Sequence, residues 1–264
     1  MNAQEETCIM KKRGQVTVFV VVGIVVVAAV GLGIYLTSVS PGEEDRAYFE
    51  SGEVASLMNN VKNSIFSCME QNGRNALIVI GVQGGYYNPP QDYFDLGWAI
   101  IPYYYDKGRF LMPSDSVIEK ELASYVDDNL GLCLDRLDFE GFDLDYESSR
   151  TTASIEQGQV TYTIDMPITV KRENKRMVLQ LAENPVSVTS SLSEILEVAD
   201  YITESHKEDP EMVCISCVAD MAEERDLYVD MLDFDEESTT LVVISENRTS
   251  EEPYIFEFLN RYPV

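Results

Sequence analysis

The pattern of apolar and polar positions opens with one long apolar run. Residues 15–37 carry no charged side chain. As a helix rising about 1.5 Å per residue, the run would be roughly 34 Å long, close to the thickness of the hydrocarbon core of a bilayer. Because backbone amides in lipid must be hydrogen-bonded within the segment, a single span has to be helical. The pattern therefore predicts a transmembrane helix over residues 15–37.

Helical periodicity returns after this run. Apolar residues between positions 57 and 69 recur at spacings of three and four, which predicts an amphipathic helix or stalk over residues 43–82. The remainder, residues 83–264, is expected to form a head. Within the head, cap residues and apolar periodicity predict helices over residues 114–137, with Ser114 or Ser116 as the cap, and over residues 191–202 and 209–221.

A period of two then predicts strands. Val160, Tyr162, Ile164 and Met166 alternate with polar residues, as in a half-buried strand. Residues 84–113 lack clear periodicity and contain several Gly and Pro residues, so we expect a long irregular segment there. The head is therefore predicted to be α+β, with helices packed on one face of an antiparallel β-sheet. The expected strands are residues 160–166, 177–181, 227–234, 239–246 and 254–259.

The charges on either side of the apolar run predict its orientation. Lys11, Lys12 and Arg13 precede the run, whereas the first charged residues after it are Glu43 and Glu44. The positive-inside rule then places the short N-terminus in the cytoplasm and the head outside the cell. A cleavable secretory signal is the alternative, although its apolar core would span only about 7 to 15 residues.

The residues around the start of the run resemble a known family. The basic triplet, Gly14, Gln15 and the apolar residues that follow are similar to the class III signal peptide of archaeal type IV pilin-like proteins. The resemblance covers about the first 36 residues. It implies that a membrane peptidase cuts between Gly14 and Gln15 and leaves the helix in the mature protein. Phe19 stands where bacterial pilins carry Glu, which argues against a bacterial pilin. An uncut signal anchor is the other interpretation of these residues.

Acidic residues dominate the composition. The chain carries 46 Asp and Glu against 19 Lys and Arg, a formal net charge of −27. Such a surface repels the phosphates of nucleic acids, so DNA and RNA are not expected as partners. Abundant carboxylates with few lysines also suit solubility in strong salt, which suggests a halophilic source.

Four of the five cysteines lie on the outer side of the predicted membrane helix, where disulfides form. We expect two disulfides and favour Cys68–Cys133 and Cys214–Cys217 among the three possible connectivities. Cys214 and Cys217 also fit the redox-active CxxC pattern. A four-cysteine zinc site is a further alternative, although such sites normally contain two closely spaced pairs. Cys8 is expected to be a free thiol on the inner side.

A dense group of aromatic residues lies in the segment expected to be irregular. Tyrosine and tryptophan present an apolar ring and a polar tip, so a loop of this kind suits the binding of a glycan or peptide. The alternative is that the rings cap the core beneath the loop. The candidate partner-binding residues are Tyr86, Tyr87, Trp98, Tyr103, Tyr104 and Tyr105.

Other motifs give weaker signals. Asn247 begins a glycosylation sequon, Asn-Arg-Thr, that fits an exposed loop outside the cell. The single histidine, His206, stands among acidic residues and is expected on the surface. The sequence contains no GxSxG, HExxH or P-loop motif, and its acidic clusters do not match an EF-hand. We therefore expect no enzymatic activity, no cofactor and no metal site.

These features favour a pilin-like, membrane-anchored archaeal surface protein whose acidic head makes adhesive, subunit or partner contacts. Its expected partners are the lipid bilayer, further copies or pilus subunits packed through the small residues of the apolar helix, and a cell-surface protein or glycan. The alternative is a membrane-anchored glycan- or peptide-binding module that does not polymerise. An anchored exoenzyme is a third, weaker hypothesis.

Overall fold

A computed structural model describes residues 43–209, 212–234, 238–246 and 253–263, together with residues 21, 24 and 26. Among these residues, no helix is both long enough and apolar enough to cross a bilayer. The predicted leader (residues 1–14), the processing site Gly14–Gln15 and the sequon at Asn247 lie outside the described residues. So does the predicted membrane helix over residues 15–37, apart from residues 21, 24 and 26. These four features therefore stay predictions.

The helix expected over residues 43–82 is divided into two. Helix α2 (Glu43–Phe49) is followed by α3 (Gly52–Val82), a helix of 31 residues. The break falls where Gly52 adopts a positive φ of 51°, a conformation that costs glycine little and interrupts a right-handed helix. Along α3 the buried side chains recur at helical spacing and include Met58, Val61 and Ile65. The predicted amphipathic face is therefore present, on a helix that begins nine residues later.

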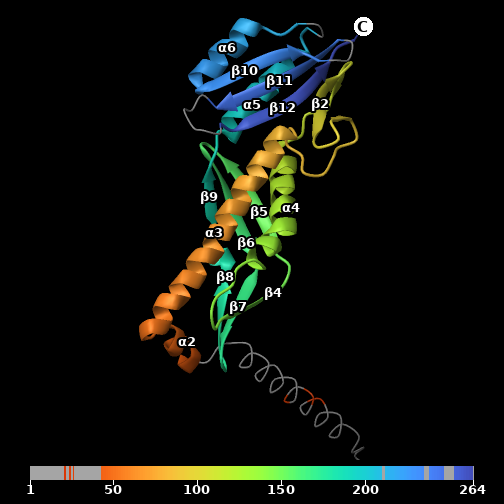
Figure 1. The fold of residues 1–264 in the computed structure, drawn as a ribbon. Helices are drawn as coiled ribbons and strands as arrows, with labels where there is room; N and C mark the ends of the chain where they lie inside the picture. Colours follow the sequence, from red (N-terminus) through yellow and green to blue (C-terminus); the bar gives the residue numbers. More distant parts are fainter. Residues whose placement is uncertain are drawn as a thin grey trace, which may run out of the picture.

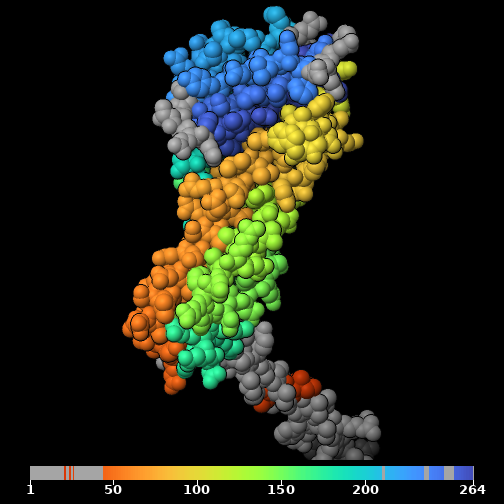
Figure 2. Space-filling model, in the orientation of Figure 1, coloured from red at the N-terminus to blue at the C-terminus, as the bar shows by residue number. Residues whose placement is uncertain are grey.

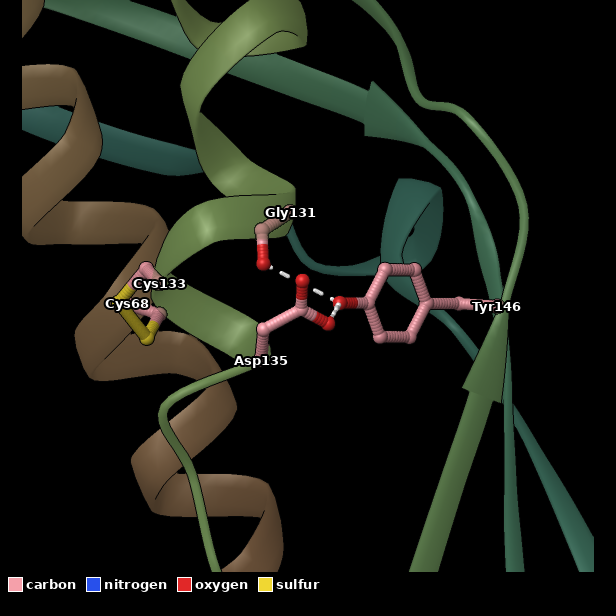
Figure 3. Close-up of a disulfide and its surroundings, with 5 residues drawn as sticks. All are labelled: Cys68, Gly131, Cys133, Asp135 and Tyr146. Carbon is pink, nitrogen blue, oxygen red and sulfur yellow. Dashed lines mark hydrogen bonds between the residues drawn. A yellow bond between two sulfur atoms is a disulfide. The ribbon is translucent and has the colours of Figure 1, made fainter.

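A disulfide joins α3 to α4 (Asp115–Leu134), the helix expected over residues 114–137. Cys68 on α3 and Cys133 on α4 form the bond, which is one of the two favoured pairs. Their sequence separation is 65 residues, so in the chain-entropy account the crosslink stabilises the fold by roughly 4 kcal/mol. Figure 3 shows the bond on one side of α4 and Tyr146 on the other, where the Tyr146 hydroxyl donates to the Gly131 carbonyl oxygen at 3.1 Å.

Six strands form two short antiparallel sheets that follow one another along the molecule. One sheet has the order β4-β7-β8 and the other β5-β6-β9. Helices α3 and α4 cover one face of both sheets (Figure 1), and we call this assembly the stem. The stem matches the expected antiparallel sheet with helices on one face. Its strands are β4 (Asp143–Tyr146), β5 (Arg150–Glu156), β6 (Gln159–Asp165), β7 (Pro167–Arg172), β8 (Lys175–Gln180) and β9 (Val186–Thr189).

A separate six-stranded sheet, which we call the terminal sheet, lies at the other end of the stem. Its order is β1-β2-β12-β11-β10, with β3 paired to β2, and β12 runs parallel to β2. The head is therefore α+β, as predicted, but its described residues form three sheets in place of one antiparallel sheet, and one of the three is mixed. The strands are β1 (Tyr93–Asp95), β2 (Ile100–Asp106), β3 (Arg109–Phe110), β10 (Leu227–Asp233), β11 (Thr239–Glu246) and β12 (Ile255–Arg261).

The segment expected to be irregular supplies three strands of the terminal sheet. Every residue of β2 is buried, so the strand shows none of the alternation that reveals a half-exposed one. Helix α5 (Leu192–Ser205) packs on one face of this sheet, and α6 (Ile215–Glu224) lies beside β10 (Figure 1). Helix α6 begins at Ile215 with Cys214 as its N-cap residue, later than the expected start at Asp209.

The molecule is elongated, and α3 extends along the stem to the terminal sheet. In Figure 2, α3 (orange) and α4 (lime) form the middle of the body, and the C-terminal strands (blue) form one end. At its C-terminal end, α3 approaches β12 so closely that a Cβ on Gly81 would lie 2.2 Å from the Ile255 carbonyl oxygen. Glycine at position 81 therefore allows the helix and the sheet to meet backbone against backbone.

We predict that Gly81→Ala destabilises the protein although alanine is the better helix former. The new methyl group would force α3 away from β12, at a cost of about 2 kcal/mol or more. The control is Gly131→Ala on α4, where the nearest atom to the added Cβ is 3.9 Å away in the Tyr146 ring. That variant should gain up to about 1 kcal/mol from helix propensity. Equal effects of the two substitutions on the free energy of unfolding in urea would contradict the close approach.

Candidate partner-binding site

Three of the six candidate aromatic residues are unavailable to a partner. Tyr103, Tyr104 and Tyr105 are all buried in β2. The Tyr104 ring stacks on Phe258 with 4.3 Å between centroids, and its hydroxyl donates to the Gly84 carbonyl oxygen at 3.0 Å. The prediction that these three tyrosines bind a partner is wrong, because the segment forms a central strand whose rings fill the core on both faces.

The other three candidates do not form a common surface. Tyr86 and Tyr87 are half-buried, and Tyr87 packs edge-on against Tyr125 of α4. The backbone N–H of Tyr87 also donates to the Glu121 carboxylate at 3.1 Å. Trp98, in the turn between β1 and β2, is 77% exposed. Of the six rings, only that of Trp98 is largely exposed, and it remains a candidate for ligand contact.

An apolar groove lies between α6 and β10. It has a volume of about 810 Å³, within the usual range for ligand sites. Its floor contains the buried side chains of Val218, Ala222 and Leu227, and its rim includes Ile215 and Tyr228, which are 62% and 58% exposed. The residues that line it are Ile215, Val218, Ala219, Ala222, Glu223, Asp226, Leu227, Tyr228, Val229 and Met231.

The sheet edge beside this groove is open in the described part of the chain. Strand β10 stands at the end of the terminal sheet and pairs with β11 alone among the described strands. An edge strand keeps a row of backbone N–H and C=O groups that an added strand can pair with. A groove between a helix and such an edge suits an extended peptide, because main-chain hydrogen bonds then give affinity and side-chain pockets give specificity.

The residues around the groove carry strong negative charge. Between positions 212 and 234 the only basic residue is Arg225. Its guanidinium bonds the Glu197 carboxylate at 2.8 and 2.9 Å, so this cation is already paired. The acidic residues in the same range are Asp220, Glu223, Glu224, Asp226, Asp230 and Asp233. The field at the groove therefore favours a positively charged ligand.

Three buried polar residues, Asp106, His206 and Asn260, lie elsewhere, at strands β2 and β12 of the terminal sheet. His206 is only 2% exposed, so its predicted surface position is wrong. Its ring stacks on Tyr105 with 4.6 Å between centroids and meets Tyr262 edge-on. One residue after Tyr105 on β2, the buried Asp106 carboxylate accepts hydrogen bonds from Arg261, at 2.6 Å, and from Arg109. Burial would raise the pKa of Asp106, but the two guanidinium groups together lower it.

The hydrogen bonds around His206 determine its tautomer. Asn260 Oδ1 accepts from the Tyr105 backbone N–H at 3.1 Å, so the Asn260 amide nitrogen faces His206 Nε2 at 3.4 Å. Since an amide nitrogen only donates, Nε2 must accept, and the ring proton lies on Nδ1. Burial lowers the pKa of His206 by more than the backbone and carboxylate of Asp209 raise it. The buried ring is neutral and acts as a structural group.

No protein-family model, curated protein or solved structure matches this chain significantly. Within the described ranges, no group of three or more His, Cys, Asp or Glu side chains is arranged to hold a metal ion. The groove between α6 and β10 is therefore the candidate site on physical grounds alone. Sequence reasoning missed it because its walls, near positions 218 and 229, come from two elements whose packing depends on the whole terminal sheet.

We predict a pH dependence of stability that comes from His206. Below its ordinary pKa of 6.5 the unfolded chain binds a proton that the folded chain does not, so the free energy of unfolding should fall as pH falls from 7.5 to 5.5. The slope has an upper limit of about 1.4 kcal/mol per pH unit. His206→Phe keeps a ring between Tyr105 and Tyr262 but cannot titrate, and its stability should change less over this range. Identical pH profiles of the two proteins in urea titrations at fixed salt would contradict the assignment.

Proposed function

We propose that the chain is a pilin-like, membrane-anchored archaeal surface protein, with its N-terminus in the cytoplasm and its acidic head outside the cell. The uncharged run over residues 15–37 and the basic residues before it support the anchor and its orientation. Helix α2, the first described helix after that run, lies at one end of the described body, and the groove between α6 and β10 lies towards the other (Figure 1). This arrangement would hold the groove away from the membrane.

In this proposal the head binds an extended, positively charged segment of another polypeptide. The observation that carries the proposal is the combination of an apolar groove, an open edge at β10 and six neighbouring carboxylates against one paired arginine. A second copy of the same head would bring its own negative charge to the groove, which disfavours head-to-head pairing. Self-association is therefore assigned to the apolar helix and partner binding to the head. The proposed role is binding rather than catalysis.

The alternative is an anchored glycan- or peptide-binding module that does not polymerise. The exposed ring of Trp98 favours contact with a sugar, since an aromatic face suits the apolar side of a pyranose. The alternative shares the anchor and the head with the first proposal. The two differ in whether the leader is removed and whether filaments form.

The processing of the N-terminus gives the first test. If a pilin-type peptidase acts on this chain, mass spectrometry of the protein from native membranes will find Gln15 as the first residue. Blocking the site with Gly14→Leu should leave the leader attached and abolish filaments seen by electron microscopy. An intact leader ahead of Gln15 in the native protein would remove the pilin-like assignment and leave the anchored module.

Peptide binding gives the second test. We expect full-length protein in detergent to bind a synthetic peptide of alternating Lys and Val at least about tenfold more tightly than its Glu and Val counterpart, and to lose affinity as salt is raised. Ala219→Trp would fill the groove and should weaken binding at least about tenfold. Ala47→Trp on α2 makes the same change on an exposed helix outside the groove and should bind like wild type. The proposed site would be contradicted if the Lys and Val peptide bound no more tightly than the Glu and Val peptide. Equal affinity of the Ala219→Trp and Ala47→Trp variants for the Lys and Val peptide would also contradict it.

A further inference from the structure

The two disulfides of the described chain differ sharply in position. Cys68–Cys133 joins two helices across a separation of 65 residues, and Cys68 is buried. Cys214–Cys217 closes a separation of three residues, and both cysteines are exposed. Crosslinking so short a loop removes far less chain entropy than crosslinking a long one. The local bond therefore contributes less to stability, and it is the one that a partner can reach.

The surroundings of Cys214 suit it to leave as a thiolate. It is the N-cap residue of α6, a helix of ten residues, and its Sγ accepts a hydrogen bond from the Cys217 backbone N–H at 3.3 Å. The Ser216 hydroxyl oxygen lies 3.6 Å from the same sulfur. Backbone donors and the positive end of a helix both stabilise a negative charge on sulfur. Because a better leaving thiolate speeds exchange, Cys214 favours opening of the bond.

The surface around the bond is apolar and connects with the groove. Met212 and Ile215, on either side of Cys214, are 67% and 62% exposed. Ile215 also forms part of the groove between α6 and β10, and Val218, directly after Cys217, lies in its floor. A polypeptide that contacts this surface would bring its own side chains close to the two sulfurs.

The geometry points to Cys214–Cys217 as a thiol–disulfide exchange site that oxidises a dithiol on another polypeptide, a function beyond partner binding. A thiolate of the partner attacks Cys217 Sγ, forms a mixed disulfide and expels Cys214 as a thiolate. The second partner thiol, deprotonated, then attacks the partner sulfur of that mixed disulfide and expels the Cys217 thiolate. The partner leaves with a disulfide, and the two thiolates at positions 214 and 217 take up the two protons that the partner lost. Two electrons pass from the partner dithiol to the protein.

Equilibration with glutathione tests the exchange site without reference to the groove. Full-length protein in detergent is incubated in buffers with an increasing ratio of reduced to oxidised glutathione, and its free thiols are then alkylated. Mass spectrometry identifies which cysteines were alkylated and distinguishes Cys8 from the other four. Where Cys214–Cys217 is half reduced, we expect less than about one tenth of Cys68–Cys133 to be reduced and the circular dichroism to be unchanged. The proposal would be overturned if both disulfides were reduced over the same range of glutathione ratio. It would also be overturned if Cys214–Cys217 were reduced only when the circular dichroism showed a loss of structure.

Single-cysteine variants test the role of Cys214. In Cys217→Ser the remaining Cys214 should react with iodoacetamide about tenfold faster at neutral pH than Cys217 does in Cys214→Ser. Adding Ser216→Ala to Cys217→Ser should slow Cys214, whereas adding Ser124→Ala on α4 should not. Equal rates in the two single variants would overturn the assignment of Cys214 as the leaving thiolate. Binding of the Lys and Val peptide is measured separately, so loss of exchange and loss of the groove are distinguishable.

Discussion

The architecture depends on one helix, α3, that packs against the stem and the terminal sheet at once. At Gly73, a Cβ would lie 2.8 Å from the Tyr162 ring of β6, and at Gly81, two turns further along α3, it would meet the backbone of β12. The Tyr162 hydroxyl donates to the Gly73 carbonyl oxygen at 3.0 Å, so the ring both fills the space above the glycine and ties the helix to the sheet. Gly73 and Gly81 therefore let α3 approach the stem and the terminal sheet closely. Because both contacts are on one helix, they fix the position of the stem relative to the terminal sheet.

This constraint accounts for the elongated form of the molecule. At the lower end, α2 is held to β8 by an ion pair of 2.9 Å between Lys175 and Asp45, and along the middle the disulfide from Cys68 fixes α4 beside α3. At the upper end, the C-terminal turns of α3 support the terminal sheet, and the proposed groove lies between α6 and β10 of that sheet. A head built in this way holds the groove between α6 and β10 at a fixed distance from α2, the first described helix after the proposed membrane anchor. The packing of α3, which determines where the groove lies, is therefore the physical basis of the proposed function.

Local signals in the sequence predicted the elements better than their assembly. Alternation around Tyr162 predicted β6, cysteine counting predicted two disulfides, and the favoured connectivity is the one present. Strands β10, β11 and β12 were predicted, but β1, β2 and β3 were missed. The mixed sheet was missed with them, because its parallel pairing joins β2 to β12, more than 150 residues later in the chain. A continuous apolar run from Ile100 to Tyr105 is typical of a fully buried strand, and this signal would have predicted β2. No local signal predicted the burial of His206, since the rings that enclose it come from positions 105 and 262.

Native-state hydrogen exchange tests most directly whether α3 unites the two ends of the molecule. In full-length protein at increasing urea, the opening free energies of amides in β6 and β11 should converge on a single value and show the same dependence on denaturant. The reason is that neither the stem sheet that contains β6 nor the terminal sheet that contains β11 can open without losing its contact with α3. The amides of α3 near Gly73 and Gly81 should converge on the same value. If β11 exchanged through a separate opening of clearly lower free energy while β6 stayed protected, the two ends would be independent. That result would contradict the claim that α3 supports the groove rigidly.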